Sequence, residues 1–165
     1  MTDVEKKIKA RETIAFEYTV EQILPTEWTA THTEGEFDRW DITATNGNET
    51  VYIETKMRDI TAESVEEEGC LVNYDKVEYL ANTGQKAAII QYFPLSNKCY
   101  VWNVKEKDQW PKKKINKSKN NYSEEKIWDT VYYMPMDSEH QRKVDLTDYE
   151  ERWDRIMTEI NTKYE

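Results

Sequence analysis

The chain has 165 residues, enough for one domain with a hydrophobic core and too few for two such domains. Charged residues make up 34% of it, but six Trp and eleven Tyr supply large apolar side chains, so a disordered chain is not expected. No apolar run approaches the roughly 20 residues that span a bilayer, and a net charge of −10 argues against general nucleic-acid binding.

The N-terminus and the cysteines indicate the compartment. Residues 1–5 lack the basic and apolar regions of a signal peptide. Cys70 and Cys99 have no metal-binding spacing, so we expect free thiols in a reducing environment. With His32 and His140 as the two histidines, a histidine-rich zinc site is not expected. These features predict a cytoplasmic protein.

A capping box opens the first expected helix. Thr2 followed by Glu5 predicts its start, and Pro25 predicts an end near Leu24. On a helical wheel a broad apolar arc is formed by Val4, Ile8, Ala15, Phe16 and Tyr18. Glu12 falls inside this arc and is therefore a candidate site residue. The alternative is that Glu12 lies at the edge of the arc and reaches solvent.

Two β-rich segments on either side of residues 46–49 predict a hairpin. If the first and last of these four residues close the turn, Asp41 lies directly opposite Glu54, with Cβ atoms roughly 4.5–5.5 Å apart. Lys56 then lies on the same face as Glu54, because side chains alternate along a strand. A two-residue turn at the first two positions would instead place Asp41 opposite Tyr52.

The remaining elements are indicated by apolar periodicity and turn residues. In chain order they are a helix at about 71–82 ended by Gly84, strands at 86–93 and 98–104, a lysine-rich loop at 111–121, a strand at about 126–134, and a final helix opened by a capping box of Thr147 and Glu150. This order predicts an α/β (α+β) single domain with a central mixed sheet flanked by helices. We expect a core of about residues 3–104 and a C-terminal extension of about 105–165.

The strongest chemical signal is Glu54-Thr55-Lys56 with Asp41 across the hairpin. Glu-x-Lys occurs three times in this charged chain, so the spacing alone is weak, but only this copy ends an apolar hairpin strand. Mg²⁺ prefers carboxylate and water oxygens, which Asp41 and Glu54 could supply, with the Thr55 carbonyl as a third ligand. Lys56 could orient a water or stabilise developing negative charge. The alternative is an exposed cross-strand ladder of ion pairs.

Lysines form the candidate nucleic-acid contacts. Five of them lie within eight residues, namely Lys112, Lys113, Lys114, Lys117 and Lys119, with Tyr122 close by. They could bind the phosphate backbone, or they could belong to a solvated loop. Lys76 lies near the apolar side of its expected helix and is a further candidate; alternatively, its stem covers the core and its amine is in solvent.

This arrangement resembles the PD-(D/E)XK phosphodiesterase superfamily, which includes many restriction endonucleases and Holliday-junction resolvases. The matching residues are Asp41, then twelve residues, then Glu54-Thr55-Lys56. The upstream helix with Glu12 and the following helix and strand fit the αβββαβ core of that family. The resemblance implies a restriction-endonuclease-like fold, Mg²⁺ or Mn²⁺ held by Asp41 and Glu54, and a catalytic role for Lys56.

The finer pattern around this motif resembles small phage-type members of the superfamily, through residues 38–41, 56–59, 71–80 and 91–94. It implies a bacterial cell or a phage-infected host. Asp38 is an alternative metal ligand, although strand parity places it on the opposite face from Asp41.

The function that we expect is a metal-dependent nuclease that hydrolyses DNA phosphodiester bonds. One alternative is a catalytically idle module of the same fold that binds nucleic acid or protein. Another is an acidic protein that mimics DNA and occupies the groove of a DNA-binding protein, as anti-restriction proteins do. Duplex, branched and single-stranded substrates all remain open, as does a homodimer, and no membrane partner is expected.

Overall fold

Six strands form the central sheet, in the order β1-β2-β3-β5-β6-β9. The structure, a computed structural model, describes residues 1–33, 40–118 and 124–164. The strands are β1 (Thr29–His32), β2 (Ile42–Thr45), β3 (Thr50–Met57), β5 (Lys86–Phe93), β6 (Lys98–Asn103) and β9 (Gln141–Arg142). The β3–β5 pair is parallel and the other neighbouring pairs are antiparallel. The expected α/β domain with a central mixed sheet is thereby confirmed.

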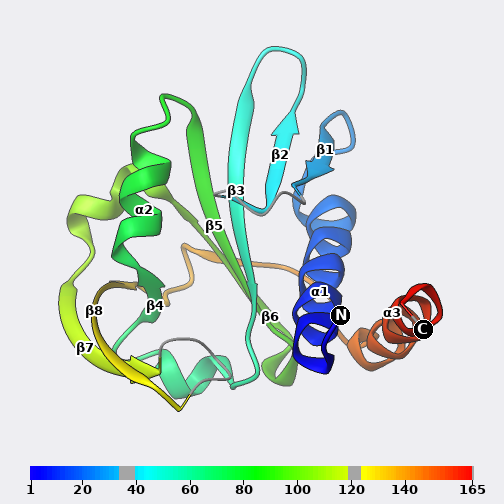
Figure 1. Ribbon diagram of the computed structural model, residues 1–165. Coiled ribbons are helices and arrows are strands. Elements are labelled where there is room, and N and C mark those ends of the chain that lie inside the picture. The colour runs from blue at the N-terminus through cyan, green and yellow to red at the C-terminus, as the bar shows by residue number, and fades with distance from the viewer. Residues whose placement is uncertain (34–39, 119–123, 165) are drawn as a thin grey trace.

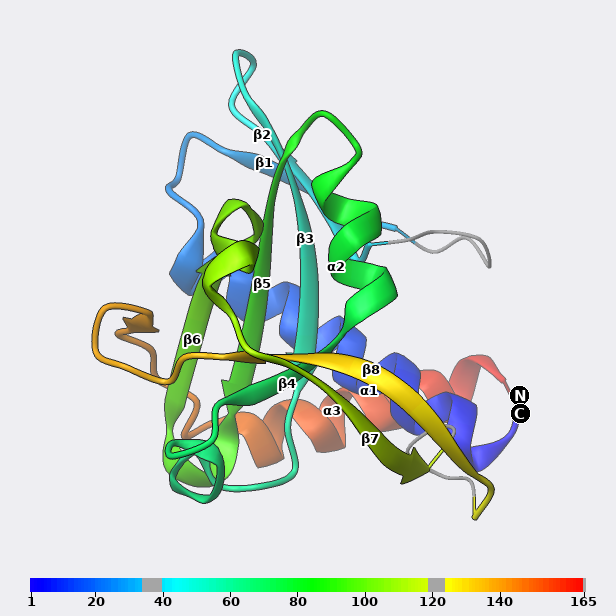
Figure 2. The same cartoon turned by 90° about the vertical axis from the view of Figure 1, so that its left-hand side faces the viewer.

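Other elements cover the two faces of this sheet. Two helices, α1 (Asp3–Tyr18) and α3 (Tyr149–Lys163), lie on one face, and a π-helical turn (Thr19–Ile23) continues α1 (Figure 1). The other face carries α2 (Tyr74–Ala81) and a second sheet (Figure 2). That sheet has the order β4-β8-β7, with β4 (Cys70–Asn73), β8 (Lys126–Met134) and β7 (Lys112–Ser118). Short 3₁₀ helices lie at Ala62–Val65, Pro94–Ser96 and Val104–Gln109. No described helix is long and apolar enough to cross a bilayer.

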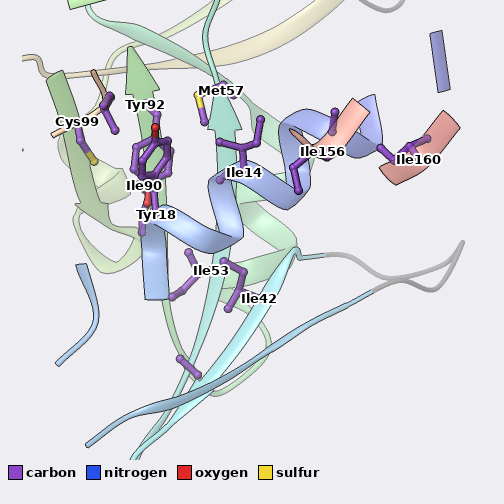
Figure 3. Packing of buried hydrophobic residues seen from close by; sticks show 14 residues of the cluster. Ile14, Tyr18, Ile42, Ile53, Met57, Ile90, Tyr92, Cys99, Ile156 and Ile160 are labelled. Carbon is purple, nitrogen blue, oxygen red and sulfur yellow. The ribbon is translucent and has the colours of Figure 1, made fainter. Parts of the chain in front are cut away.

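Two hydrophobic clusters fill the spaces on either side of the central sheet. On the helical side, Ile14 and Tyr18 of α1 pack against Ile53, Ile90 and Tyr92 (Figure 3). Alternate residues of β5 face the other cluster, so this strand is buried on both faces. The expectation that residues 86–93 form a central strand is therefore confirmed.

Helix α1 begins as expected but buries a different face. The capping box forms, since the Glu5 N–H donates to Thr2 Oγ1 and the Thr2 N–H donates to Glu5 Oε2. However, Val4 and Ile8 are 38% and 41% exposed, so their place on the expected core face is wrong. The first turns of α1 contact the end of α3 through polar groups, including a bond from Lys6 to Asn161, rather than covering the apolar sheet.

The lysine-rich segment is a strand, not the expected loop. β7 pairs with β8 along its whole length, from Lys112 opposite Tyr132 to Ser118 opposite Lys126. It is the edge strand of its sheet, and lysines are a common device for keeping such edges from pairing further. Polar composition therefore misrepresented a segment whose structure depends on a partner strand.

Two helix starts also differ from expectation. Residues 70–73 pair with β8 as strand β4, so the second helix begins at Tyr74 and not at residue 71, with Asn73 as its N-cap. The final helix begins at Tyr149 after Asp148, and the capping box of Thr147 and Glu150 does not form. The Thr147 hydroxyl instead donates to Asp145, which removes it from the capping position.

Candidate active site at the edge of the central sheet

The site lies at the end of β3 that extends past the start of β2. The hairpin has the expected turn, with Thr45 opposite Thr50, and the last β2–β3 pair is Ile42 with Ile53. β3 continues to Met57, so its last residues have no β2 neighbour. The sheet therefore has an open edge at this end of β3.

Asp41 sits at this edge, directly before β2. Its N–H donates to the Ile53 carbonyl at 3.0 Å. The Asp41 carboxylate reaches forward and accepts the Thr55 N–H at 2.8 Å and the Thr55 hydroxyl at 3.2 Å. The β2–β3 ladder has the expected register but ends at the Ile42–Ile53 pair, so Asp41 and Glu54 are not a ladder pair.

Thr55 turns its backbone toward the same opening. The N–H and C=O of one strand residue point to the same side, as their joint use in antiparallel pairs requires. The Thr55 N–H points to Asp41, so its carbonyl also points to the side that β2 leaves uncovered. A carbonyl ligand at Thr55 would need this orientation.

The open edge is hollowed into a cavity of about 220 Å³. Its charged and hydroxyl lining comes from three elements and the residue before β2, and consists of Glu12, Asp41, Glu54, Thr55, Lys56, Lys76 and Arg11. α1 contributes Glu12 from one side of the sheet, and α2 contributes Lys76 from the other. The structure therefore brings the candidate carboxylates, the candidate catalytic lysine and Lys76 into one place.

Glu54 is the electrostatic centre of this cavity. Its side chain is 13% exposed, and Oε1 accepts a hydrogen bond from Lys76 Nζ at 2.7 Å. Burial, followed by the nearby charge of Asp41, raises the pKa of Glu54 to about 7. Burial acts to lower the pKa of Lys76, but Glu54 outweighs it and the pKa of Lys76 is raised. Near neutral pH the pair can therefore gain or lose a proton.

The other two titrating groups are shifted in opposite senses. Burial and then the charge of Asp41 raise the pKa of Glu12. Burial lowers the pKa of Lys56, and Arg58 lowers it further. Each shift favours the neutral form of its group, and a bound cation would favour the ionised form of the carboxylates.

The donor set is of the kind that Mg²⁺ and Mn²⁺ accept, because it is made of carboxylate and carbonyl oxygens. The carboxylates of Glu12, Asp41 and Glu54 do not all approach within 4.8 Å of one another. In the described part of the chain that criterion is met by Asp137, Glu139 and His140, before β9. There the His140 ring already bonds Asp137 and Glu106, so that group reads as an ion-pair cluster.

A second cavity of about 250 Å³ continues from the first on the α2 side and shares Glu54, Lys56 and Lys76 with it. It adds Arg58 and Lys117, so strand β7 carries one of its lysines to the site. Arg58 is not among the residues that the sequence pattern indicated. Its position two residues after Lys56 was the available signal, because such residues share a strand face.

Three further candidate lysines on β7 do not line either cavity. Lys112 lies over the Tyr74 ring, and Lys113 pairs with Glu68 at 3.3 Å. Lys114 is exposed on β7. Lys119, Tyr122 and the alternative ligand Asp38 lie outside the described residues.

Comparison with known proteins adds one structural likeness. No family model matches the chain, and no curated protein matches it. Among solved structures, the chain is similar to Hjc, a Holliday junction resolvase from the archaeal hyperthermophile Archaeoglobus fulgidus. The two are 19% identical over 68% of this chain and 79% of the resolvase, with a TM-score of 0.38.

Proposed function

We propose that the protein is a metal-dependent nuclease that hydrolyses DNA phosphodiester bonds at the open edge of β3. The observation that carries the proposal is the shared cavity of Asp41, Glu54 and Lys56, with Glu12 beside them. Three carboxylates and a lysine that line one hollow supply both a cation site and a proton-transfer group. An exposed cross-strand ladder would not bury Glu54 to 13% exposure.

Asp41, Glu54 and the Thr55 carbonyl would hold Mg²⁺ or Mn²⁺. A bound ion of this kind lowers the pKa of a coordinated water and offsets charge on a scissile phosphate. Asp41 is fixed for this purpose by two hydrogen bonds from Thr55. Its orientation is therefore set before a ligand arrives, as a preorganised site requires.

Lys56 is the proposed group for activating or orienting the attacking water. It follows Glu54 by two residues on the same strand face, and burial lowers its pKa. A lowered pKa brings the amine closer to the range in which it exchanges protons at neutral pH. Glu12, with its raised pKa, is the second proposed proton-transfer group.

The proposed path of the DNA backbone passes over the second cavity. Arg58 and Lys117 line it beside Lys56, so positive charge lies next to the proposed reaction centre. Phosphate contacts of this kind give affinity without sequence preference. Lys112, Lys113 and Lys114 extend the positive charge along β7.

One observation favours a second candidate, a nuclease fold that binds nucleic acid without cutting it. The Lys76 ammonium already lies 2.7 Å from Glu54, so the chain itself supplies a cation to this carboxylate. The acidic mimic has less support, because Glu63 and Glu66 pair with Lys98, and Glu68 pairs with Lys113. The acidic run therefore presents fewer free charges than its sequence suggests.

Cleavage assays decide between these candidates. Supercoiled, linear, branched and single-stranded DNA would be incubated with the protein in Mg²⁺, in Mn²⁺ and in chelator. The proposal predicts metal-dependent cutting that is lost in Asp41→Asn and kept in Asp137→Asn, the matched carboxylate control. Binding with no cutting of any substrate would support the idle module instead. Equal cutting by both variants would place the activity elsewhere.

The proposal includes a cytoplasmic location and leaves the oligomeric state to experiment. Cys70 and Cys99 are both free and buried, as a reducing compartment allows. One site of this kind acts on one strand, so a homodimer would be needed to cut two strands at once. Sedimentation of the protein with and without branched DNA measures this.

A further inference from the structure

Trp128 is exposed to an unusual degree for its type. It is 72% exposed, the highest value among the large apolar side chains of the described residues. It lies on β8 opposite Asn116 of β7, toward the free end of this pair of strands. Tyr132, on the same face of β8, is buried against the core, so the exposed indole lies beyond the part of the strand that the fold covers.

Lysines flank this indole on the same face of the β7–β8 pair. Lys126 precedes Trp128 by two residues, and Lys114 is its diagonal neighbour across the strands. Lys114 and Lys126 form no ion pair with any described residue, although Lys126 donates to Ser118. On the opposite face, Lys113 pairs with Glu68 and Lys117 pairs with Asp129. Two lysines without an ion pair to a described residue therefore lie beside Trp128 on this face.

We infer that this face of the β7–β8 pair binds an unpaired nucleotide, with its base stacked on Trp128 and its flanking phosphates on Lys114 and Lys126. Exposed aromatic rings between cationic side chains are the combination that binds single-stranded nucleic acid. A base inside a duplex is already stacked on its neighbours and cannot offer a free face to the indole. The proposal thus specifies single-stranded segments or unpaired junction nucleotides.

Charge favours a nucleic acid over other partners for this surface. The chain as a whole carries −10, which repels a polyanion from most of its surface. On the Trp128 face, Lys114 and Lys126 place positive charge beside the indole, so a nucleic-acid strand can use the charge and the ring together. The three-stranded sheet crosses in front of the central strands (Figure 2), and its other face places Lys117 and Val131 at the proposed active site.

This inference rests on the proposed function and deepens it, because it names the part of the substrate that is held beside the site. Only the backbone of β7, the edge strand, separates the Trp128 face from the face that carries Lys117. A flexible single strand that is held by Trp128 can therefore pass over this edge to the cavity. A rigid duplex end has no such path.

Fluorescence anisotropy in chelator tests this without any cleavage. The probes are a short labelled oligothymidylate, an abasic oligomer of the same length, and a blunt hairpin duplex. Trp128→Ala should weaken oligothymidylate binding about tenfold and leave the abasic oligomer unchanged, since only the base stacks. Trp128→Phe should restore most of the affinity, and Val20→Ala, a partly exposed apolar residue elsewhere, should change nothing. Equal losses on both oligomers, or no loss, would overturn the inference.

The lysines have a separate readout. Lys114→Gln and Lys126→Gln should each reduce the slope of log affinity against log salt by about 0.7, the value for one phosphate of a single strand. Lys163→Gln, in the last turn of α3, should leave the slope unchanged. Unchanged slopes in all three variants would contradict phosphate contacts at this face.

The outcomes separate this inference from the proposed nuclease activity. Trp128-dependent binding without cleavage would uphold the stacking site and refute the nuclease. Asp41-dependent cleavage with oligothymidylate binding that ignores Trp128 would do the opposite. A change in sedimentation of Trp128→Ala without DNA would show that a second copy covers the indole, and would overturn the inference.

Discussion

The Lys76 ammonium lies 2.7 Å from Glu54 Oε1, so helix α2 supplies the counter-charge for a carboxylate of strand β3. The Glu54 side chain is 13% exposed and that of Lys76 is 44% exposed. A carboxylate at this depth would be costly without a partner. Strand β3 and helix α2 thus meet at the proposed catalytic cavity through this ion pair. Several measurable properties depend on it.

Removing the cation should destabilise the protein only where Glu54 is ionised. At pH 8, Lys76→Met should lower the free energy of unfolding by about 1–2 kcal/mol, since the half-exposed amine reduces the cost of breaking a buried pair. At pH 5, Glu54 is mostly protonated and the loss should shrink. Urea unfolding measures both. Lys86→Met, which breaks the exposed pair with Glu49, should cost less than about 0.5 kcal/mol at either pH. Equal losses at pH 5 and 8 would contradict the ion-pair account.

Glu54 should make the protein less stable as pH rises. Its pKa is raised from 4.5 to about 7, so the folded state binds the proton more tightly than the unfolded state does. This contribution is fully present below pH 4.5 and is lost as pH rises through 7. From pH 5 to 8, wild type should lose on the order of 2 kcal/mol relative to Glu54→Gln. Glu49→Gln is the exposed control. If the free energy of unfolding of Glu54→Gln changed with pH just as that of wild type does, the raised pKa of Glu54 would be refuted.

Metal binding should follow the same titration. Mn²⁺ affinity, measured by calorimetry, should rise from pH 6 to 8 because Glu54 must lose its proton to coordinate an ion. Asp41→Asn should weaken binding at pH 8 by at least about tenfold, since even the loss of a supporting group costs that much. Asp137→Asn, in the acidic group before β9, should bind as wild type does. If Asp137→Asn weakened Mn²⁺ binding and Asp41→Asn did not, the metal site would be the acidic group before β9.

Local sequence predicted the hairpin but not the end of its ladder. The turn residues fixed the pairing of Thr45 with Thr50, which the structure confirms. They could not fix where β2 begins, because that depends on contacts outside the hairpin. The Asp41 carboxylate accepts a hydrogen bond from the Thr55 N–H, which the hairpin register alone did not predict. The motif residues still reach one cavity, because strand alternation and the parallel β3–β5 pair constrain them strongly.

The second sheet could not be predicted from short stretches of sequence. β4 and β8 are about 60 residues apart in sequence, and neither shows that the other will pair with it. Without that pairing, Lys112–Ser118 had only its polar composition to indicate a structure, and composition favours a loop. The approach of Lys117 to Glu54 and Lys56 was missed for the same reason.

A glycine substitution tests how this second sheet is attached. Gly69, just before β4, has φ +107°, and a Cβ there would lie 2.8 Å from the Met134 carbonyl oxygen. Gly69→Ala should therefore destabilise the protein by about 2–4 kcal/mol, from backbone strain and the clash together. Gly47→Ala has a similar φ of +94° but meets nothing within 4 Å, so about 1 kcal/mol is expected. Thermal unfolding compares them, and equal costs would mean that β4 and β8 are not so closely joined.

The most direct test of the account is single-turnover cleavage of DNA by Lys56→Met beside wild type in Mn²⁺. Lys56 lies in the cavity with Asp41 and Glu54, and the account assigns it to the chemical step and not to metal binding. The predicted result is a fall in rate of about 100-fold or more, with Mn²⁺ affinity unchanged. Cleavage at the wild-type rate by Lys56→Met would contradict the central claim.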